Sequence, residues 1–299
     1  MTRAEDGLIQ WAFSADAAGS PVPALAWLPP LGSNERPPPV VLLGHGGTGH
    51  KGMERHHRLA HRLVKHGIAA LAIDGPFHGD RAALGDGPLS YQQQVIAAGP
   101  LSVHQHMQRD WLAALAVLAE NHPINQLRVG FLGVSMGARY GLAVCAELGP
   151  RLKAAVIAKF GLVSPDETMT AMGAPELNRA CAAAITAPVL HHVQWDDEVF
   201  TRAGQLDLFD CFASRTKLLR ARPGPHTVTR DDDEDAWLRH LITKLSSHGD
   251  EAATACWSRN PRRVMLLCGV KGPGAGMVAR PFVGVKVLRP LRGRAAPES

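Results

Sequence analysis

Short apolar runs alternate along the chain with longer segments in which apolar residues recur every three or four positions. The runs predict buried strands, and the segments between them predict amphipathic helices. Strands are expected at 40–43, 68–73, 127–132, 153–160, 188–193 and 216–221, and helices at 53–66, 104–121, 138–148, 203–214 and 235–245. This alternation predicts an α/β fold in which helices cover both faces of a mostly parallel, doubly wound sheet.

Three segments depart from this alternation. Residues 8–28 alternate weakly between apolar and polar positions and are interrupted by Gly19-Ser20-Pro21, which predicts two antiparallel edge strands joined by a turn. Segments 80–103 and 162–187 each follow the end of a strand, where active-site loops belong in open α/β sheets. We expect short lid segments there, since neither is long enough for a separate domain.

Composition indicates a globular protein with a substantial core, because 45% of the 299 residues are apolar and 20% are charged. The net charge of +5 is unevenly distributed. From Arg259 onward there are nine basic residues and one acidic residue, which leaves residues 1–258 with 23 basic and 26 acidic groups. The mildly acidic main part gives no reason to expect nucleic-acid binding, and the sequence has no apolar run long enough to cross a membrane.

The cysteines favour a reducing compartment. They are odd in number, dispersed and without a C-x-x-C pair, at Cys145, Cys181, Cys211, Cys256 and Cys268. This pattern predicts free thiols rather than a disulfide framework. The first residues also lack the apolar stretch of a signal peptide, so a cytoplasmic location is expected.

A sharp strand-to-helix turn is predicted at the pentapeptide Gly133-Val134-Ser135-Met136-Gly137, which separates the strand 127–132 from the helix 138–148. In this context, G-x-S-x-G is the pattern of a nucleophile elbow. The small flanking residues let the strand and helix approach closely, and the strained central residue projects its hydroxyl above the sheet. We therefore predict that Ser135 is a catalytic nucleophile.

Serine needs a base, and the base needs an acid that orients it. In elbow-type folds the acid and then the histidine follow the serine in chain order. His226 lies after the last predicted strand and before the closing helix, where the base is required. The loop after the strand 188–193 offers three carboxylates, at Asp196, Asp197 and Glu198.

These motifs together resemble the α/β-hydrolase superfamily, in its dienelactone hydrolase-like and esterase branch. The matching segments are the elbow, Leu43 to Gly49, Pro188 to Val199 and Gly224 to His226. The resemblance implies Asp197 as the acid of the triad, with Asp196 as the alternative because Gln194 stands where many relatives carry glycine. It also implies oxyanion-hole donors at Gly47 or Thr48 and at Met136, the residue after the nucleophile.

Metal and cofactor sites are not expected. His56, His57 and His61 lie on one predicted helix, but they lack an H-E-x-x-H pattern and predict a solvated basic face. The glycine-rich segment after the first parallel strand lacks the ending of a phosphate-binding P-loop. The acidic run Asp231 to Glu234 predicts a solvated cap that complements the dipole of the closing helix.

The predicted function is that of a serine hydrolase that cleaves carboxylic esters through a Ser135–His226–Asp197 triad and an acyl-enzyme intermediate. Small residues in 162–187 suggest short acyl chains. The substrate expected is a small-molecule ester, without nucleic acid or membrane as a partner. Two alternatives stay open, which are a peptidase or acyltransferase with the same triad and a non-catalytic binding protein on this fold.

The last segment of the chain is expected to lie outside the hydrolase fold. Residues 1–249 complete the predicted domain, and residues 250–299 are basic and repeatedly interrupted by glycine and proline. Such a segment cannot bury enough apolar surface to offset its ordering entropy. We expect a dispensable, poorly ordered C-terminal extension.

Overall fold

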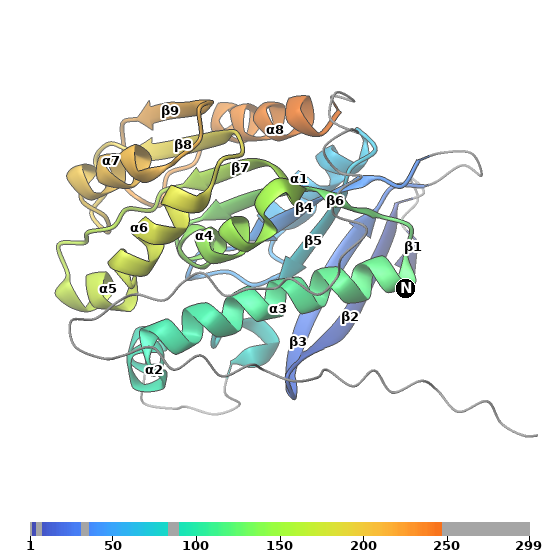
Figure 1. Cartoon of the computed structure of the whole chain (residues 1–299), viewed down its shortest axis with the longest axis horizontal. Helices are drawn as coiled ribbons and strands as arrows, with labels where there is room; N and C mark the ends of the chain where they lie inside the picture. The colour runs from blue at the N-terminus through green and yellow to red at the C-terminus, as the bar shows by residue number, and fades with distance from the viewer. Residues whose placement is uncertain (1, 4–7, 31–35, 83–89, 247–299) are drawn as a thin grey trace, which may run out of the picture. The chain divides into compact units, whose positions relative to one another are not determined.

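The computed structural model describes residues 2–3, 8–30, 36–82 and 90–246. Within these residues the chain forms a nine-stranded sheet in the order β1-β2-β3-β5-β4-β6-β7-β8-β9 (Figure 1). The strands are β1 (Thr2–Arg3), β2 (Ile9–Ala17), β3 (Ser20–Leu28), β4 (Pro39–Gly44), β5 (Ala69–Ile73), β6 (Asn125–Val134), β7 (Leu152–Ala158), β8 (Val189–Gln194) and β9 (Lys217–Arg222).

The sheet is antiparallel at its N-terminal end and parallel elsewhere. Strands β1, β2, β3 and β5 pair antiparallel, whereas β5, β4, β6, β7, β8 and β9 are parallel. The predicted antiparallel pair in 8–28 is confirmed as the β2–β3 hairpin, whose register closes at Ala17 and Ser20. One detail was wrong, because β3 also pairs with β5 and therefore lies inside the sheet.

Helices cover both faces of the sheet, as the alternation predicted (Figure 1). One face carries α3 (Pro100–Asn121), α4 (Met136–Leu148), α6 (Pro175–Ala184) and α7 (Arg202–Cys211), and the other carries α1 (Glu54–Val64) and α8 (Asp231–Ser246). Of the expected lid segments, 80–103 contains the short helix α2 (Tyr91–Ala98), and 162–187 contains α5 (Glu167–Met172) and α6. Helices α2 and α5 pack against each other. Short 3-10 turns occupy Gly79–Arg81 and Gly149–Arg151.

The central strands β4 and β5 and the carboxyl halves of β6 and β7 are apolar because each of their faces meets a helix layer. In β4, Val40 and Leu42 belong to the core under α3 and α4, and Val41 and Leu43 belong to the core under α1 and α8. Successive side chains of a strand point to opposite faces, so a strand buried on both faces needs an apolar residue at every position. This explains why the parallel strands were visible as continuous apolar runs.

Two helix starts differ from the prediction. Helix α3 begins at Pro100 rather than at 104, with proline in its first turn. Helix α8 begins at Asp231 rather than at 235, so the acidic run forms its first turn. The prediction of a solvated cap was wrong for Asp233 and Glu234, which are buried, whereas Asp231 and Asp232 are exposed. Asp233 accepts hydrogen bonds from Arg220 and Arg222 of β9, and Glu234 pairs with Arg58 of α1 at 2.8 Å.

Several histidines are buried instead of solvated. The prediction of a solvated face on α1 was wrong for His56, which is 1% exposed and places Nδ1 3.0 Å from the carbonyl oxygen of Lys51. Burial lowers the pKa of His56 and His104 to about 3. It lowers the pKa of His45, His191 and His192 to about 4. These imidazoles are therefore neutral in the folded protein near pH 7.

Other expectations concern residues that the structure describes only in part. The predicted extension 250–299, with Cys256 and Cys268, lies outside the described residues. In the described part, Cys145 and Cys181 are buried free thiols and Cys211 is a half-buried one. No helix among the described residues is both long enough and apolar enough to cross a membrane.

Strand β4 and helix α4 come so close that Gly44 and Gly137 are in backbone contact. A Cβ atom at Gly137 would overlap the carbonyl group of Gly44 and stand 2.8 Å from its Cα. These are backbone atoms, so a change of side-chain rotamer cannot relieve the overlap. Glycine is therefore required at this contact.

Gly137→Ala is expected to lower the free energy of unfolding by about 3 kcal/mol, the cost of forcing extra volume into a packed site. Gly46→Ala is the matched control, because a Cβ there would meet its nearest atom, the Val134 carbonyl oxygen, at 3.8 Å. The control should change stability by less than about 1 kcal/mol. Urea unfolding of both variants measures the difference, and equal losses would contradict the packing argument.

Acid should destabilise the fold through the buried histidines. Their folded-state pKa lies below the ordinary value of 6.5, so the unfolded chain binds more protons between about pH 6.5 and pH 4. Stability is then complete above pH 6.5 and is lost as the pH falls through this window. His191→Gln should reduce the loss between about pH 7 and pH 5 by on the order of 1 to 2 kcal/mol.

Unfolding curves at both pH values test this expectation, with His106→Gln as the control because His106 is an exposed residue of α3. The control should keep the pH dependence of the wild type. The same pH dependence in His191→Gln and the wild type would show that His191 does not contribute to acid unfolding.

Candidate active site

The turn between β6 and α4 holds Ser135 in a strained conformation. Its backbone has φ 54° and ψ −113°, which an L-residue rarely adopts. The Ser135 amide donates to the carbonyl oxygen of Ala158, the last residue of β7, at 2.8 Å. A Cβ at Gly133 would lie 2.7 Å from the amide nitrogen of Ala138, so this turn needs the small residues that the motif supplies.

His226 lies in the loop between β9 and α8, next to Ser135. Its Nε2 atom is 2.9 Å from Ser135 Oγ, and its Nδ1 atom is 2.8 Å from Asp197 Oδ2. The His226 side chain is 14% exposed, whereas the Asp197 carboxylate is fully buried. A carboxylate only accepts hydrogen bonds, so Nδ1 carries the proton in this pair and Nε2 can accept one from the serine hydroxyl.

The three carboxylates of the loop after β8 have different partners. Asp197 Oδ1 accepts from the amides of Val199 and Phe200 at 2.8 and 2.9 Å, which leaves Oδ2 facing His226. Asp196 accepts from the Gly224 amide at 2.8 Å with its side chain 56% exposed. Glu198 accepts from the His226 amide at 2.9 Å. The structure thus brings Asp197, and not Asp196, to the imidazole ring.

The glycine-rich loop after β4 is held by two histidines. The Gly75 amide donates to His45 Nε2 at 2.8 Å, and His78 Nε2 lies 2.7 Å from the Gly47 carbonyl oxygen. The expected oxyanion donors are the amides of Gly47, Thr48 and Met136. None of the three donates a hydrogen bond within the described part of the chain.

A buried carboxylate joins this loop to the segment after β5. Asp74 accepts from the Lys51 amide at 2.8 Å, from Lys51 Nζ at 2.7 Å and from the Asp80 amide at 2.9 Å. Burial by itself would raise the pKa of Asp74, but the hydrogen bonds from Lys51 and Asp80 bring that pKa below its ordinary value. Asp74 is therefore ionised and anchors both loops at the carboxyl edge of the sheet.

Two cavities lie in very different places. One of about 10 Å³ lies behind the elbow and is lined by His45, Gly75, Met107, Trp111, Met136 and Tyr140, among others. The other, of about 320 Å³, is lined by residues at the amino ends of β4, β6 and β7, such as Pro39, Asn125 and Lys153. Ser135 follows the carboxyl end of β6, so the larger cavity is not part of this site.

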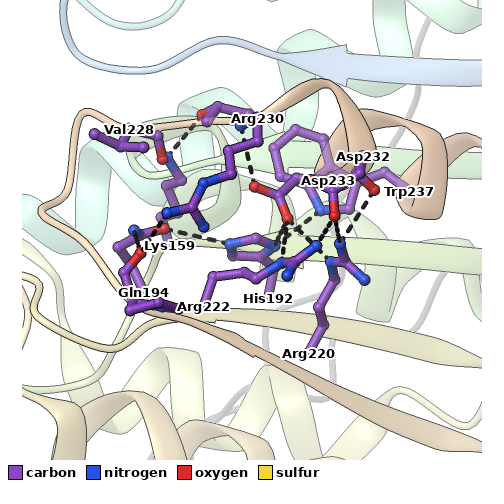
Figure 2. Close-up of polar contacts among 12 residues, drawn as sticks. Lys159, His192, Gln194, Arg220, Arg222, Val228, Arg230, Asp232, Asp233 and Trp237 are labelled. Atoms are coloured by element: carbon purple, nitrogen blue, oxygen red, sulfur yellow. Dashed lines mark hydrogen bonds and ion pairs between the residues drawn. The ribbon is translucent and has the colours of Figure 1, made fainter.

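The sequence reasoning missed one buried residue beside the site. Lys159 directly follows β7, is 1% exposed and reaches the loop that carries His226 (Figure 2). A lysine that directly follows the apolar run Ala154 to Ala158, at the carboxyl end of a parallel strand, was an available signal. No cluster of three His, Cys, Asp or Glu residues able to hold a metal ion occurs among the residues that the structure describes.

Comparisons with known proteins identify the family of the chain. Residues 30–222 match the model of the dienelactone hydrolase family. A cold-adapted esterase from an Arctic intertidal metagenomic library, in its PEG-bound structure, is 28% identical, with a TM-score of 0.64 over 82% of this chain and 100% of the esterase. No curated protein sequence matches the chain.

More distant structures share the fold. Acetyl xylan esterase from Paenibacillus sp. R4 is 18% identical, with a TM-score of 0.63 over 82% of this chain and 86% of that one. Acetyl xylan esterase 1 from Thermoanaerobacterium sp. is 16% identical, with a TM-score of 0.59 over 79% and 84% of the two chains. The family match covers well over half of the sequence and includes the elbow and the strand that precedes the buried carboxylate. The chain therefore belongs to the dienelactone hydrolase family of the α/β-hydrolase superfamily and is a carboxylic ester hydrolase.

Proposed function

We propose that the chain hydrolyses small-molecule carboxylic esters through a Ser135–His226–Asp197 triad. The supporting observation is the continuous pair of hydrogen bonds from Ser135 Oγ to His226 Nε2 and from His226 Nδ1 to Asp197 Oδ2. Serine is a weak nucleophile without such a base, and the base needs an acceptor that fixes its tautomer. The strained backbone of Ser135 further favours a catalytic role over a binding role, because such strain is typically found at functional sites.

The reaction proceeds in two halves. Ser135 Oγ attacks the ester carbonyl carbon while His226 Nε2 takes the hydroxyl proton, and the carbonyl electrons move onto oxygen. Collapse of this tetrahedral intermediate expels the alcohol, which takes the proton from His226 and leaves an acyl-enzyme. Water then attacks the acyl carbon with His226 as the base, and the acid product leaves as Ser135 regains its proton.

The negative oxygen of each tetrahedral intermediate is stabilised by backbone amides in this proposal. The donors are Met136 at the N-terminus of α4 and Gly47 or Thr48 in the loop after β4. Support comes from their unused N–H groups and from the positive end of the α4 dipole. His45, His78 and Asp74 hold the loop backbone, so the amides need little reorganisation during the reaction.

We propose that the substrate ester carries a short acyl chain. The cavity behind Met136 is about 10 Å³, and the large side chains of Met107, Trp111 and Tyr140 line it. Acetate and butyrate esters should therefore be hydrolysed faster than C12–C16 esters, without activation at a lipid interface. A panel of p-nitrophenyl esters of increasing acyl length measures this preference, and a maximum at the long chains would contradict it.

We propose that the enzyme acts in the cytoplasm. Among the described residues, Cys145, Cys181 and Cys211 are free thiols, and free thiols persist where the cell keeps them reduced.

The triad itself is tested by Ser135→Ala and His226→Ala. Each variant should lose activity by several orders of magnitude, because the three groups act as a unit. Ester hydrolysis and labelling by an active-site fluorophosphonate measure the loss, with amide substrates and acceptor alcohols as tests for peptidase or acyltransferase activity. A folded Ser135→Ala variant that kept more than a few per cent of wild-type hydrolysis would disprove the triad.

Asp197→Asn is expected to lower kcat by on the order of 10³ to 10⁴, because the amide stabilises the wrong tautomer of the histidine. Asp196→Asn is the matched control, since Asp196 contacts the Gly224 amide and not the imidazole ring. It should lower kcat by less than about tenfold. The reverse ranking in steady-state kinetics would transfer the role to Asp196.

A further inference from the structure

The loop that carries His226 must extend across the ends of two strands to reach Ser135. Ser135 follows β6 and His226 follows β9, and β7 and β8 lie between them in the sheet. Neighbouring strands are about 4.8 Å apart, so the ends of β6 and β9 are separated by about 14 Å. A loop of this reach needs contacts along its way that fix the imidazole within hydrogen-bonding distance of the serine.

Lys159 supplies such contacts from the carboxyl end of β7, next to β6. Its Nζ atom donates to the carbonyl oxygen of His226 at 3.0 Å, to the carbonyl oxygen of Val228, and to Thr229 Oγ1 at 2.7 Å. Figure 2 shows the lysine side chain running toward Val228. All three acceptors belong to the loop between β9 and α8, and an ammonium group has three N–H donors to match them.

The backbone around Lys159 is fixed to the nucleophile and to the neighbouring strand. The carbonyl oxygen of Ala158, just before it, accepts from the Ser135 amide at 2.8 Å. The Lys159 amide donates to the carbonyl oxygen of His192 in β8 at 2.8 Å, and Lys159 itself has a left-handed φ of 52°. One dipeptide thus contacts the serine through its backbone and the histidine loop through its side chain.

We propose that Lys159 is a positioning residue, whose ammonium group holds the His226 loop over the end of β7 so that the imidazole stays aligned with Ser135. This inference rests on the triad proposed above. Lys159 does not touch the reacting atoms. It acts through the main-chain carbonyl of the histidine and through the two residues that lead into α8.

The charges around Lys159 make this contact sensitive to alkaline pH. Arg55 from α1, His192 from β8, Asp233 from α8, and Asp197 and Glu198 from the loop after β8 surround its ammonium group. Burial is the main cause that lowers the pKa of Lys159 to about 8, and Arg55 adds to it, whereas the three carboxylates oppose it. A neutral amine keeps only two N–H donors, so it cannot donate to all three acceptors.

The effect of alkaline pH on stability distinguishes a loss of loop positioning from unfolding of the protein. The folded-state pKa of Lys159 is below its ordinary value of 10.5, so the unfolded chain binds more protons between about pH 8 and pH 10.5. This group therefore adds stability as the pH rises through that range. Activity should fall above about pH 8 while the lysine itself causes no loss of stability.

The test uses the full chain and four proteins, which are the wild type, Lys159→Met, Thr229→Val and Lys153→Met. The methionine keeps the apolar stem of Lys159 and removes the ammonium group. Thr229→Val removes one of the three acceptors of Lys159, together with the 3.3 Å hydrogen bond that Arg55 donates to the same oxygen. Lys153→Met is the matched control, because Lys153 lies at the amino end of β7, the strand that Lys159 directly follows at its carboxyl end. The measurements are p-nitrophenyl acetate hydrolysis from about pH 6 to pH 10, thermal unfolding, and active-site titration with a fluorophosphonate.

Lys159→Met is expected to lower kcat per titrated site about 10- to 100-fold and to leave KM within about threefold of the wild-type value. The fall of kcat above about pH 8, the alkaline limb of the pH profile, should disappear in this variant. Thr229→Val should lower kcat about threefold and keep the fall in activity above about pH 8, because Lys159 loses one of its three acceptors and retains the ammonium group. The control should match the wild type. The rate of fluorophosphonate labelling should fall in parallel with kcat.

Unchanged kcat per titrated site and an unchanged alkaline limb in Lys159→Met would overturn the proposal, even if thermal stability fell. Should Lys159→Met fail to fold, Thr229→Val decides the question, and wild-type kcat in that variant overturns the proposal. Failure of the triad looks different, because the wild type itself would then resist fluorophosphonate labelling or Ser135→Ala would remain active.

Discussion

The strained strand-to-helix turn at Ser135 is the constraint on which the arrangement of the neighbouring strands and helix depends. A strand that passes directly into a helix leaves no space for a side chain two positions before or two positions after the central residue, and the backbone of that residue is strained. Glycine at 133 and 137 permits the turn, and Gly44 on the neighbouring strand β4 permits the approach of α4. The Ser135 amide is bonded to β7, so both neighbours of β6 take part in holding the nucleophile.

The strain at this turn needs a rigid surrounding, and the two apolar layers provide it. The parallel strands bury side chains on both faces, which is the main source of stability for a sheet of this kind. Polar groups hold the loops at the carboxyl edge, where the apolar layers end. Asp74 fixes the loop of the oxyanion donors, and Lys159 fixes the loop of His226. The apolar layers thus stabilise the fold, and buried charges position the loops.

Local patterns in the sequence were sufficient for the sheet, most element positions and the candidate triad. Apolar runs mark strands buried on both faces, and the elbow needs its glycines within five residues, so both leave a signal at short range. Chain order then placed His226, since the base of an elbow-type fold follows the last strand. The resemblance favoured Asp197 over Asp196 but left both open, because both are acidic residues of one loop, and in the structure they differ in their hydrogen-bond partners.

The residues whose burial the sequence did not predict are those whose contacts come from distant parts of the chain. Asp233 looked like a solvated member of an acidic run, but Arg220 and Arg222 on β9 bury and neutralise it, as Figure 2 shows. His56 looked like part of a basic surface, yet the main chain of Lys51 covers it. A charged residue is buried only where partners from other parts of the fold reach it. The sequence of a single helix or strand does not show those partners. For the same reason Lys159 was overlooked, since its three acceptors lie about seventy residues further along the chain.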